Sequence, residues 1–109
     1  MTDRGRQRRR EERKYKRLNV RYGAKTPEYK AVATHISTRG LFLAVNDVVF
    51  TKDSPIVVEI TGPTEIWIAT GLVRHAVKVH PNVARFARPG MGVELLEMPP
   101  GCRDFLARL

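Results

Sequence analysis

The chain has 109 residues, 42% of them hydrophobic and 28% charged, and a formal net charge of +9 at pH 7. This length fits one small domain with a modest core, and no apolar run approaches the about 20 residues that a membrane-spanning helix needs. The Arg-rich N-terminus lacks the apolar segment of a secretory signal, and the single cysteine excludes an internal disulfide. We therefore expect a protein of a reducing, cytoplasmic compartment, without a membrane span.

The positive charge is concentrated at the N-terminus. Residues 1–17 contain nine Lys or Arg and three acidic side chains, so they contribute +6 of the net +9. Residues 1–12 contain almost no apolar side chain, and we expect a flexible arm there, followed by a single domain over residues 13–109. Such an arm favours a partner that carries phosphate, namely nucleic acid, a nucleotide or an anionic lipid. The alternative is a solvated tail that only aids solubility.

Six short segments with period-two alternation follow, and this pattern is typical of β-strands. In the second segment, Val32 and Ile36 fall on one face. Ala33, His35 and Ser37 fall on the opposite face. In chain order, the expected strands cover residues 18–24, 28–37, 40–45, 55–62, 65–80 and 91–98.

The fifth strand is long, and its Gly71 predicts a bend or bulge, because a missing side chain eases a kink. The chain ends in a short helix within residues 99–109, whose Phe105 and Leu109 are spaced i, i+4 to dock on the body. Six strands and a terminal helix indicate an antiparallel barrel or sandwich. We predict a mainly all-β fold, a six-stranded antiparallel β-barrel, since closure removes the two edges that a small open sheet exposes.

Residues suited to catalysis are few. The chain has three histidines and no obvious pair of acids. "ISTRG" is not the G-x-S-x-G elbow of a serine nucleophile, and neither a P-loop nor a G-x-G-x-x-G loop is present. His75 in a strand and His80 at a loop opening suit surface positions better than metal ligation. We predict that the protein is not an enzyme and holds neither a metal nor a cofactor.

A binding site is better supported, by two motifs. Arg13 and Arg17 stand four residues apart before the first strand, with Lys14 and Lys16 between them. The guanidinium fork matches two phosphate oxygens or the O6/N7 edge of guanine. The S-x-x-G turn at residues 37–40 adds a hydroxyl and backbone N–H groups that a ligand can approach closely at the glycine. Together they predict a clamp for a small, doubly charged, guanine-containing ligand, although composition alone leaves RNA equally open.

These motifs resemble those of the PilZ domain, the bacterial receptor module for cyclic di-GMP. That family carries R-x-x-x-R ahead of the first strand and [D/N]-x-S-x-x-G at the corner between the second and third strands. Here "RKYKR" covers residues 13–17 and "HISTRG" covers residues 35–40. The segments "ISTRGLFL" and "GMGVELLE" are also similar to the family's corner and closing strand. The resemblance implies a barrel of the PilZ type that binds cyclic di-GMP, often as an intercalated pair of molecules.

The resemblance also implies the site residues. The arginines of the first motif would grip the phosphates and guanine, and the turn would complete the pocket. The ligand-binding set that follows is Arg13, Lys14, Arg17, His35, Ser37, Arg39 and Gly40. Binding would order the arm across the barrel, and an unidentified effector protein would read the new surface.

His35 departs from the family pattern, which has Asp or Asn there. A carboxylate accepts hydrogen bonds from both N1 and N2 of guanine, whereas neutral imidazole offers one acceptor and protonated imidazole none. A hydrogen bond to a charged group contributes roughly 1.5–3 kcal/mol. Histidine in place of the acidic residue would therefore weaken the binding of cyclic di-GMP by about tenfold to a hundredfold. By strand alternation His35 shares a face with Ser37 and is expected to point toward the pocket, to stack on a base or approach a phosphate. The alternative is an exposed histidine that only fills a strand position.

Two other functions stay open at this point. A degenerate PilZ adaptor would have lost the nucleotide through His35 and would act by protein–protein interaction. A nucleic-acid binder would track a phosphate backbone with its arm, and its affinity would fall steeply as salt rises. The arm has only Tyr15 for base stacking, which counts against nucleic acid as a partner.

Overall fold

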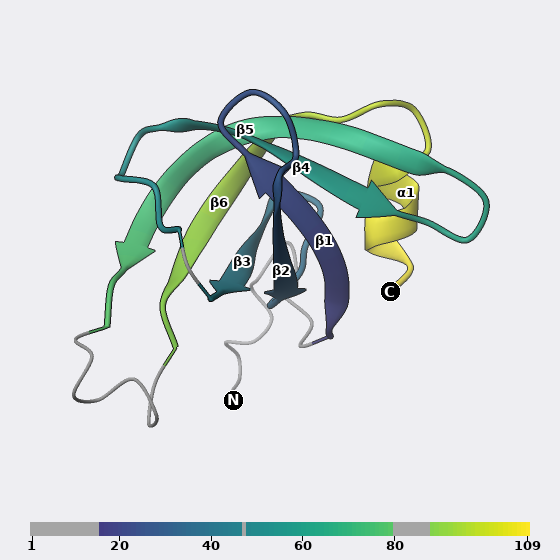
Figure 1. Cartoon of the computed structure of the whole chain (residues 1–109). Helices are drawn as coiled ribbons and strands as arrows, with labels where there is room; N and C mark the ends of the chain where they lie inside the picture. Colours follow the sequence, from purple (N-terminus) through teal and green to yellow (C-terminus); the bar gives the residue numbers. More distant parts are fainter. Residues whose placement is uncertain (1–15, 47, 80–87) are drawn as a thin grey trace, which may run out of the picture.

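Six antiparallel strands close into a barrel, and a short helix covers one end of it (Figure 1). The computed structural model describes residues 16–46, 48–79 and 88–109. The strands are β1 (Leu18–Gly23), β2 (Tyr29–Thr34), β3 (Gly40–Val45), β4 (Pro55–Thr61), β5 (Ile66–Val77) and β6 (Gly90–Glu97), and helix α1 spans Cys102–Ala107. Around the barrel the order is β1-β2-β3-β6-β5-β4, with every neighbouring pair antiparallel. The predicted fold class is confirmed.

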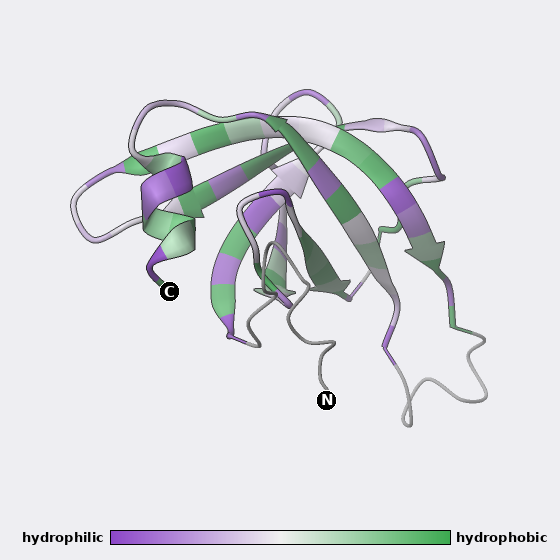
Figure 2. Ribbon diagram, turned by 180° about the vertical axis from the view of Figure 1, so that it is seen from behind, coloured by the Kyte–Doolittle hydropathy of each residue, from purple (hydrophilic) through white to green (hydrophobic). Residues whose placement is uncertain are grey.

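The period-two pattern of the sequence places one face of each strand inside the barrel, and the ribbon shows the resulting alternation of hydropathy (Figure 2). In β3, Leu41, Leu43 and Val45 are buried, whereas Phe42 and Ala44 are half-buried on the outside. Strands β1 and β4 follow the same alternation, as predicted. Full burial of an aliphatic side chain contributes about 1.5–3 kcal/mol, so these inward rows supply most of the driving force for closure.

Strand β2 departs from the prediction in its length and in its inward face. It ends at Thr34 rather than at residue 37, and Ala33 is buried while Val32 is half-buried on the outside. At His35 the backbone takes a positive φ of 50°, which interrupts the alternation. Thr34 and Ile36 are therefore both buried. The predicted grouping of Val32 with Ile36 is wrong because one left-handed residue separates them.

Strand β5 bends where the sequence predicts. Its register with β6 shifts between Thr70 and Gly71, and again between Val73 and His75. A Cβ at Gly71 would lie 2.0 Å from the carbonyl oxygen of Glu94, so the close approach of the two strands requires glycine. The bend carries the second half of β5 alongside β6, where it forms one wall of the candidate site.

Helix α1 packs against the core with a pair of residues adjacent to the predicted pair. Its buried residues are Cys102 and Leu106, whereas Phe105 and Leu109 are half-buried and pack at the margin of the core. The Phe105 ring lies against Trp67, with ring centroids 5.2 Å apart. The i, i+4 spacing is correct, but the stripe that enters the core begins at Cys102, whose small apolar side chain fits there.

Candidate functional site

The corner between β2 and β3 is a hydrogen-bonded turn built around Ser37. The hydroxyl oxygen accepts from the backbone N–H groups of Arg39 at 3.2 Å and Gly40 at 3.3 Å, and the hydroxyl donates to the Gly40 carbonyl at 3.3 Å. The Ser37 N–H also donates to that carbonyl at 2.9 Å. A hydroxyl has one donor and two acceptor positions, so all three are used within the turn. In this conformation Ser37, which is 5% exposed, shapes the corner instead of presenting a free hydroxyl.

Gly40 allows β3 to approach β6 closely. A Cβ at this position would lie 2.4 Å from the carbonyl oxygen of Val93. The Leu95 N–H donates to the carbonyl oxygen of Arg39 at 2.8 Å, which ties the turn to β6. The sequence suggested that Gly40 makes room for a ligand. In the structure the space of the missing side chain is taken by the β6 backbone, and the Gly40 N–H is bonded to Ser37.

His35 lies just after β2, and its side chain is exposed. Its φ of 50° is in the left-handed region, where Asn, Asp and His are several-fold enriched among non-glycine residues. The imidazole Nδ1 lies 3.2 Å from the hydroxyl oxygen of Thr34. Ser37 is buried, so the expectation that His35 shares a face with it is wrong. The left-handed backbone alone favours Asp, Asn or His at this position, before any ligand is considered.

A hollow of about 530 Å³ lies beside the turn. Its lining residues come from three parts of the barrel that are far apart in the sequence. The turn contributes Ser37 and Arg39, β5 contributes Arg74 and His75, and β6 contributes Gly92 and Glu94. Two guanidinium groups and one carboxylate therefore face a space large enough for part of a nucleotide.

Arg74 is oriented in this hollow by two carboxylates. Its Nε donates to Glu94 Oε1 at 2.7 Å, and its Nη1 donates to Asp53 Oδ1 at 3.1 Å. The hydrogen bond to Glu94, followed by the charge of that carboxylate, raises the pKa of the guanidinium further. Because the Arg74 side chain is 50% exposed, the ion pairs add little stability and mainly hold its position. Sequence reasoning missed this group, since its partners are 20 and 21 residues away.

The first predicted motif is only partly within the described residues. Arg17 is exposed and directly precedes β1. Leu18, the first residue of β1, pairs with Ala33 near the end of β2. Arg17 therefore lies at the same end of the sheet as His35, which follows β2. Outside the described residues lie Arg13, Lys14, the arm at 1–12 and His80. Of the predicted ligand set, the structure thus brings Arg17, His35 and the 37–40 turn to one end of the barrel.

Other reactive groups in the described part of the chain are few. No three His, Cys, Asp or Glu side chains there are grouped to hold a metal ion. Helices in the same residues are too short and too polar to cross a membrane. Cys102 is a buried free thiol, and desolvation raises its pKa, which keeps it protonated and poorly nucleophilic.

Comparison with known proteins places the chain in a family. The sequence model of the PilZ domain matches residues 7–109. The chain belongs to the PilZ family. No curated protein matches it significantly. Among solved structures, the inhibitor of motility MotI/DgrA of Bacillus subtilis superposes on 93% of this PilZ domain with a TM-score of 0.72 and 20% sequence identity. The chain spans about half, 48%, of that protein, and at this identity the likeness concerns the fold alone.

PilZ domains are receptor and adaptor modules associated with cyclic di-GMP signalling. Membership of the family therefore assigns the chain to this class. In this PilZ domain the S-x-x-G turn and Arg17 flank the same end of the barrel. Arg74 and Glu94 belong to neither motif, yet they line the hollow next to the turn. Their positions depend on the register of β5 with β6, which no local sequence signal reveals.

Proposed function

We propose that this PilZ domain is a receptor for cyclic di-GMP and that the ligand sits against the corner between β2 and β3. Two observations support the proposal: Arg17 and the 37–40 turn lie at the same end of the barrel, and a hollow lined by Arg39 and Arg74 adjoins the turn. Guanidinium groups bind phosphate oxygens and the O6/N7 edge of guanine with the same planar fork. A ligand with two phosphates and two guanines uses several such forks at once.

The roles of the motif residues divide into contact and support. Arg13, Lys14 and Arg17 approach the phosphates from the N-terminal side, and Arg39 approaches them from the turn. Ser37 and Gly40 act through the shape of the corner, because their polar groups are already bonded within it. Residues 1–12 form an arm that is ordered over the domain of residues 13–109 when the ligand binds, and an effector protein reads that change.

Glu94 supplies the guanine acceptor that His35 lacks. It pairs directly with Gly40 in the β3–β6 register, and its carboxylate borders the hollow. One oxygen accepts from Arg74, while the side chain is 43% exposed and a carboxylate has about four acceptor positions. The remaining positions suit the N1 and N2 donors of guanine. The phosphates then lie toward the arginines and away from this carboxylate.

The experiment is isothermal titration of the protein with cyclic di-GMP, with GTP as the control ligand, at near-physiological salt. Micromolar or tighter binding that is selective over GTP is expected. Arg17→Ala should weaken it, while Arg108→Ala, which removes an exposed arginine at the other end of the chain, should not. Glu94→Gln should weaken it because an amide accepts through one oxygen only. Equal binding by wild type, Arg17→Ala and Glu94→Gln would contradict the proposal.

A second function, an adaptor that no longer binds the nucleotide, is favoured by the exposed imidazole of His35 in place of an acceptor side chain. His35→Asp separates the two functions, because it restores the acceptor in a backbone conformation that Asp tolerates. A receptor should bind cyclic di-GMP already as wild type, and because Glu94 then accepts from N1 and N2 of guanine, this change should alter its affinity little. An adaptor should show no heat as wild type and should acquire binding only in the variant.

A further inference from the structure

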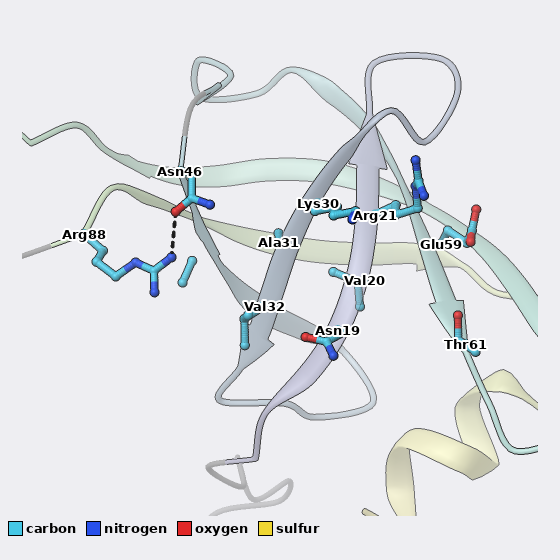
Figure 3. A pocket seen from close by; sticks show the side chains of 11 residues that line it. Asn19, Val20, Arg21, Lys30, Ala31, Val32, Asn46, Glu59, Thr61 and Arg88 are labelled. Carbon is cyan, nitrogen blue, oxygen red and sulfur yellow. Dashed lines mark hydrogen bonds between the residues drawn. The ribbon is translucent and has the colours of Figure 1, made fainter.

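A second hollow, of about 510 Å³, lies on the outer surface of the barrel (Figure 3). Its lining comes from the outward faces of β1, β2, β3 and β4 and from the segments that flank β3 and β6. Lys30 and Asn46 stand at the ends of the β2–β3 hairpin opposite the 37–40 turn. The two hollows share no lining residue, so this surface is distinct from the proposed nucleotide site.

Cationic side chains form one row of this hollow. Arg21 pairs directly with Lys30 in the β1–β2 register, and the β2–β3 register places Asn46 next to Lys30. Arg88 completes the row, and its Nη2 donates to Asn46 Oδ1 at 2.9 Å (Figure 3). Glu59 pairs with Arg21 on β4 and ends the row on the other side. The row thus carries three cations and a single carboxylate at its margin.

The next row of outward residues, across β1, β2 and β3, has short and mostly apolar side chains. Val32 pairs with Asn19 on one side and with Ala44 on the other. Val32 and Ala44 are both half-buried, so they form a low floor beside the longer cationic side chains. A row of cationic side chains beside a shallow apolar surface is complementary to a peptide that carries both acidic and small apolar side chains.

Arg21 lies directly opposite Lys30 on one neighbouring strand and directly opposite Glu59 on the other. Like charges directly opposite each other on neighbouring strands destabilise a sheet. Within the described ranges, neither Arg21 nor Lys30 makes an ion pair with a carboxylate, whereas Arg74 makes two. A bound anion between the two side chains would relieve this repulsion.

We propose that this surface binds an extended acidic segment of a partner protein. Six of the lining residues, Asn19, Arg21, Lys30, Asn46, Thr61 and Arg88, are exposed. A small molecule here would stay largely in water, whereas small-molecule sites bury about 70–90% of their ligand. From Arg21 to Arg88 the row crosses three strand spacings of about 4.8 Å, or about 14 Å. Four residues of extended chain span about 13 Å, so two acidic side chains four residues apart match the two ends of the row.

The test uses a fluorescein-labelled peptide with the core sequence Glu-Thr-Val-Thr-Glu and its Gln-Thr-Val-Thr-Gln counterpart. Each is added to the chain of residues 1–109 in the absence of nucleotide. Anisotropy and amide chemical shifts are measured with peptide up to millimolar concentration. The acidic peptide should bind more tightly than the amide peptide and should shift amides around Lys30, Asn46 and Arg88. Because cyclic di-GMP is absent, the result is independent of the proposed receptor function.

Two variants with the same change in net charge make the test specific. Lys30→Glu should weaken binding of the acidic peptide by about threefold to tenfold, because it removes an exposed charge contact and adds a repulsion of similar size. Lys52→Glu, in the loop before β4 and outside the hollow, should leave it unchanged. Both side chains are exposed, so both variants should fold. Equal effects of the two variants, shifts confined to other surfaces, or citrate binding as tightly as the peptide would each overturn the proposal.

Discussion

Replacing Gly40 by alanine is expected to destabilise the PilZ domain even without a ligand. The added Cβ would lie 2.4 Å from the carbonyl oxygen of Val93, where ordinary contact begins at 3.4 Å, so β3 and β6 must separate locally by up to the 1.0 Å difference. That separation also stretches the bond from the Leu95 N–H to the Arg39 carbonyl. Overpacking costs typically about 1–3 kcal/mol and a weakened hydrogen bond about 0.5–1.5 kcal/mol. We expect a loss of about 2–4 kcal/mol in the free energy of unfolding.

Urea unfolding followed by the fluorescence of Trp67, the single and buried tryptophan, measures this loss. With a slope of about 1–3 kcal/mol per molar urea, the midpoint should fall by about 1–2 M. Gly92→Ala is the matched control in β6, because its Cβ would meet only the Cβ of His75, at 3.2 Å. It should cost under about 1 kcal/mol. If the two variants lose equal stability, or if Gly40→Ala loses nucleotide affinity alone, the glycine does not serve strand packing.

The remaining predictions concern the backbone at His35, the buried thiol and the N-terminal motif. His35→Val should lower the free energy of unfolding by about 1–2 kcal/mol, because a β-branched residue is strained at φ 50°, while His35→Asn should be neutral; similar melting temperatures for the two would contradict this. Burial raises the pKa of Cys102, so its contribution to stability is complete below the ordinary thiol value of 9.0 and is lost as pH rises above it. Between pH 7 and pH 10, the urea midpoint of the wild type should therefore fall relative to that of Cys102→Ala. The same difference in midpoint at both pH values would refute the assignment. Cyclic di-GMP, but not GTP, should slow tryptic cleavage after Arg13 and Arg17; unchanged cleavage at saturating ligand would argue against ordering of the arm.

The strands and their inward faces could be predicted wherever the chain stays regular. Leu41, Leu43 and Val45 alternate with outward residues in the sequence and in the barrel, because a side chain in a strand changes face at every residue. The bend at Gly71 was also predictable, since glycine in a strand marks a bulge or a close approach. The same rule failed after Thr34. A single left-handed residue at His35 resets the alternation, and a positive φ at a non-glycine residue leaves no periodic signal.

The sequence by itself determined the fold class, the PilZ motifs and the departure at His35, because these depend on local periodicity and on short spacings along the chain. Only the tertiary structure decided what the motif residues do. It uses the hydroxyl of Ser37 within the turn and gives the space at Gly40 to β6. It also assembled Arg74 with Glu94 and Asp53, and Arg88 with Asn46. The contacts of Arg74 and Arg88 join positions at least 20 residues apart, and they form because barrel closure sets which strands are neighbours and in which register.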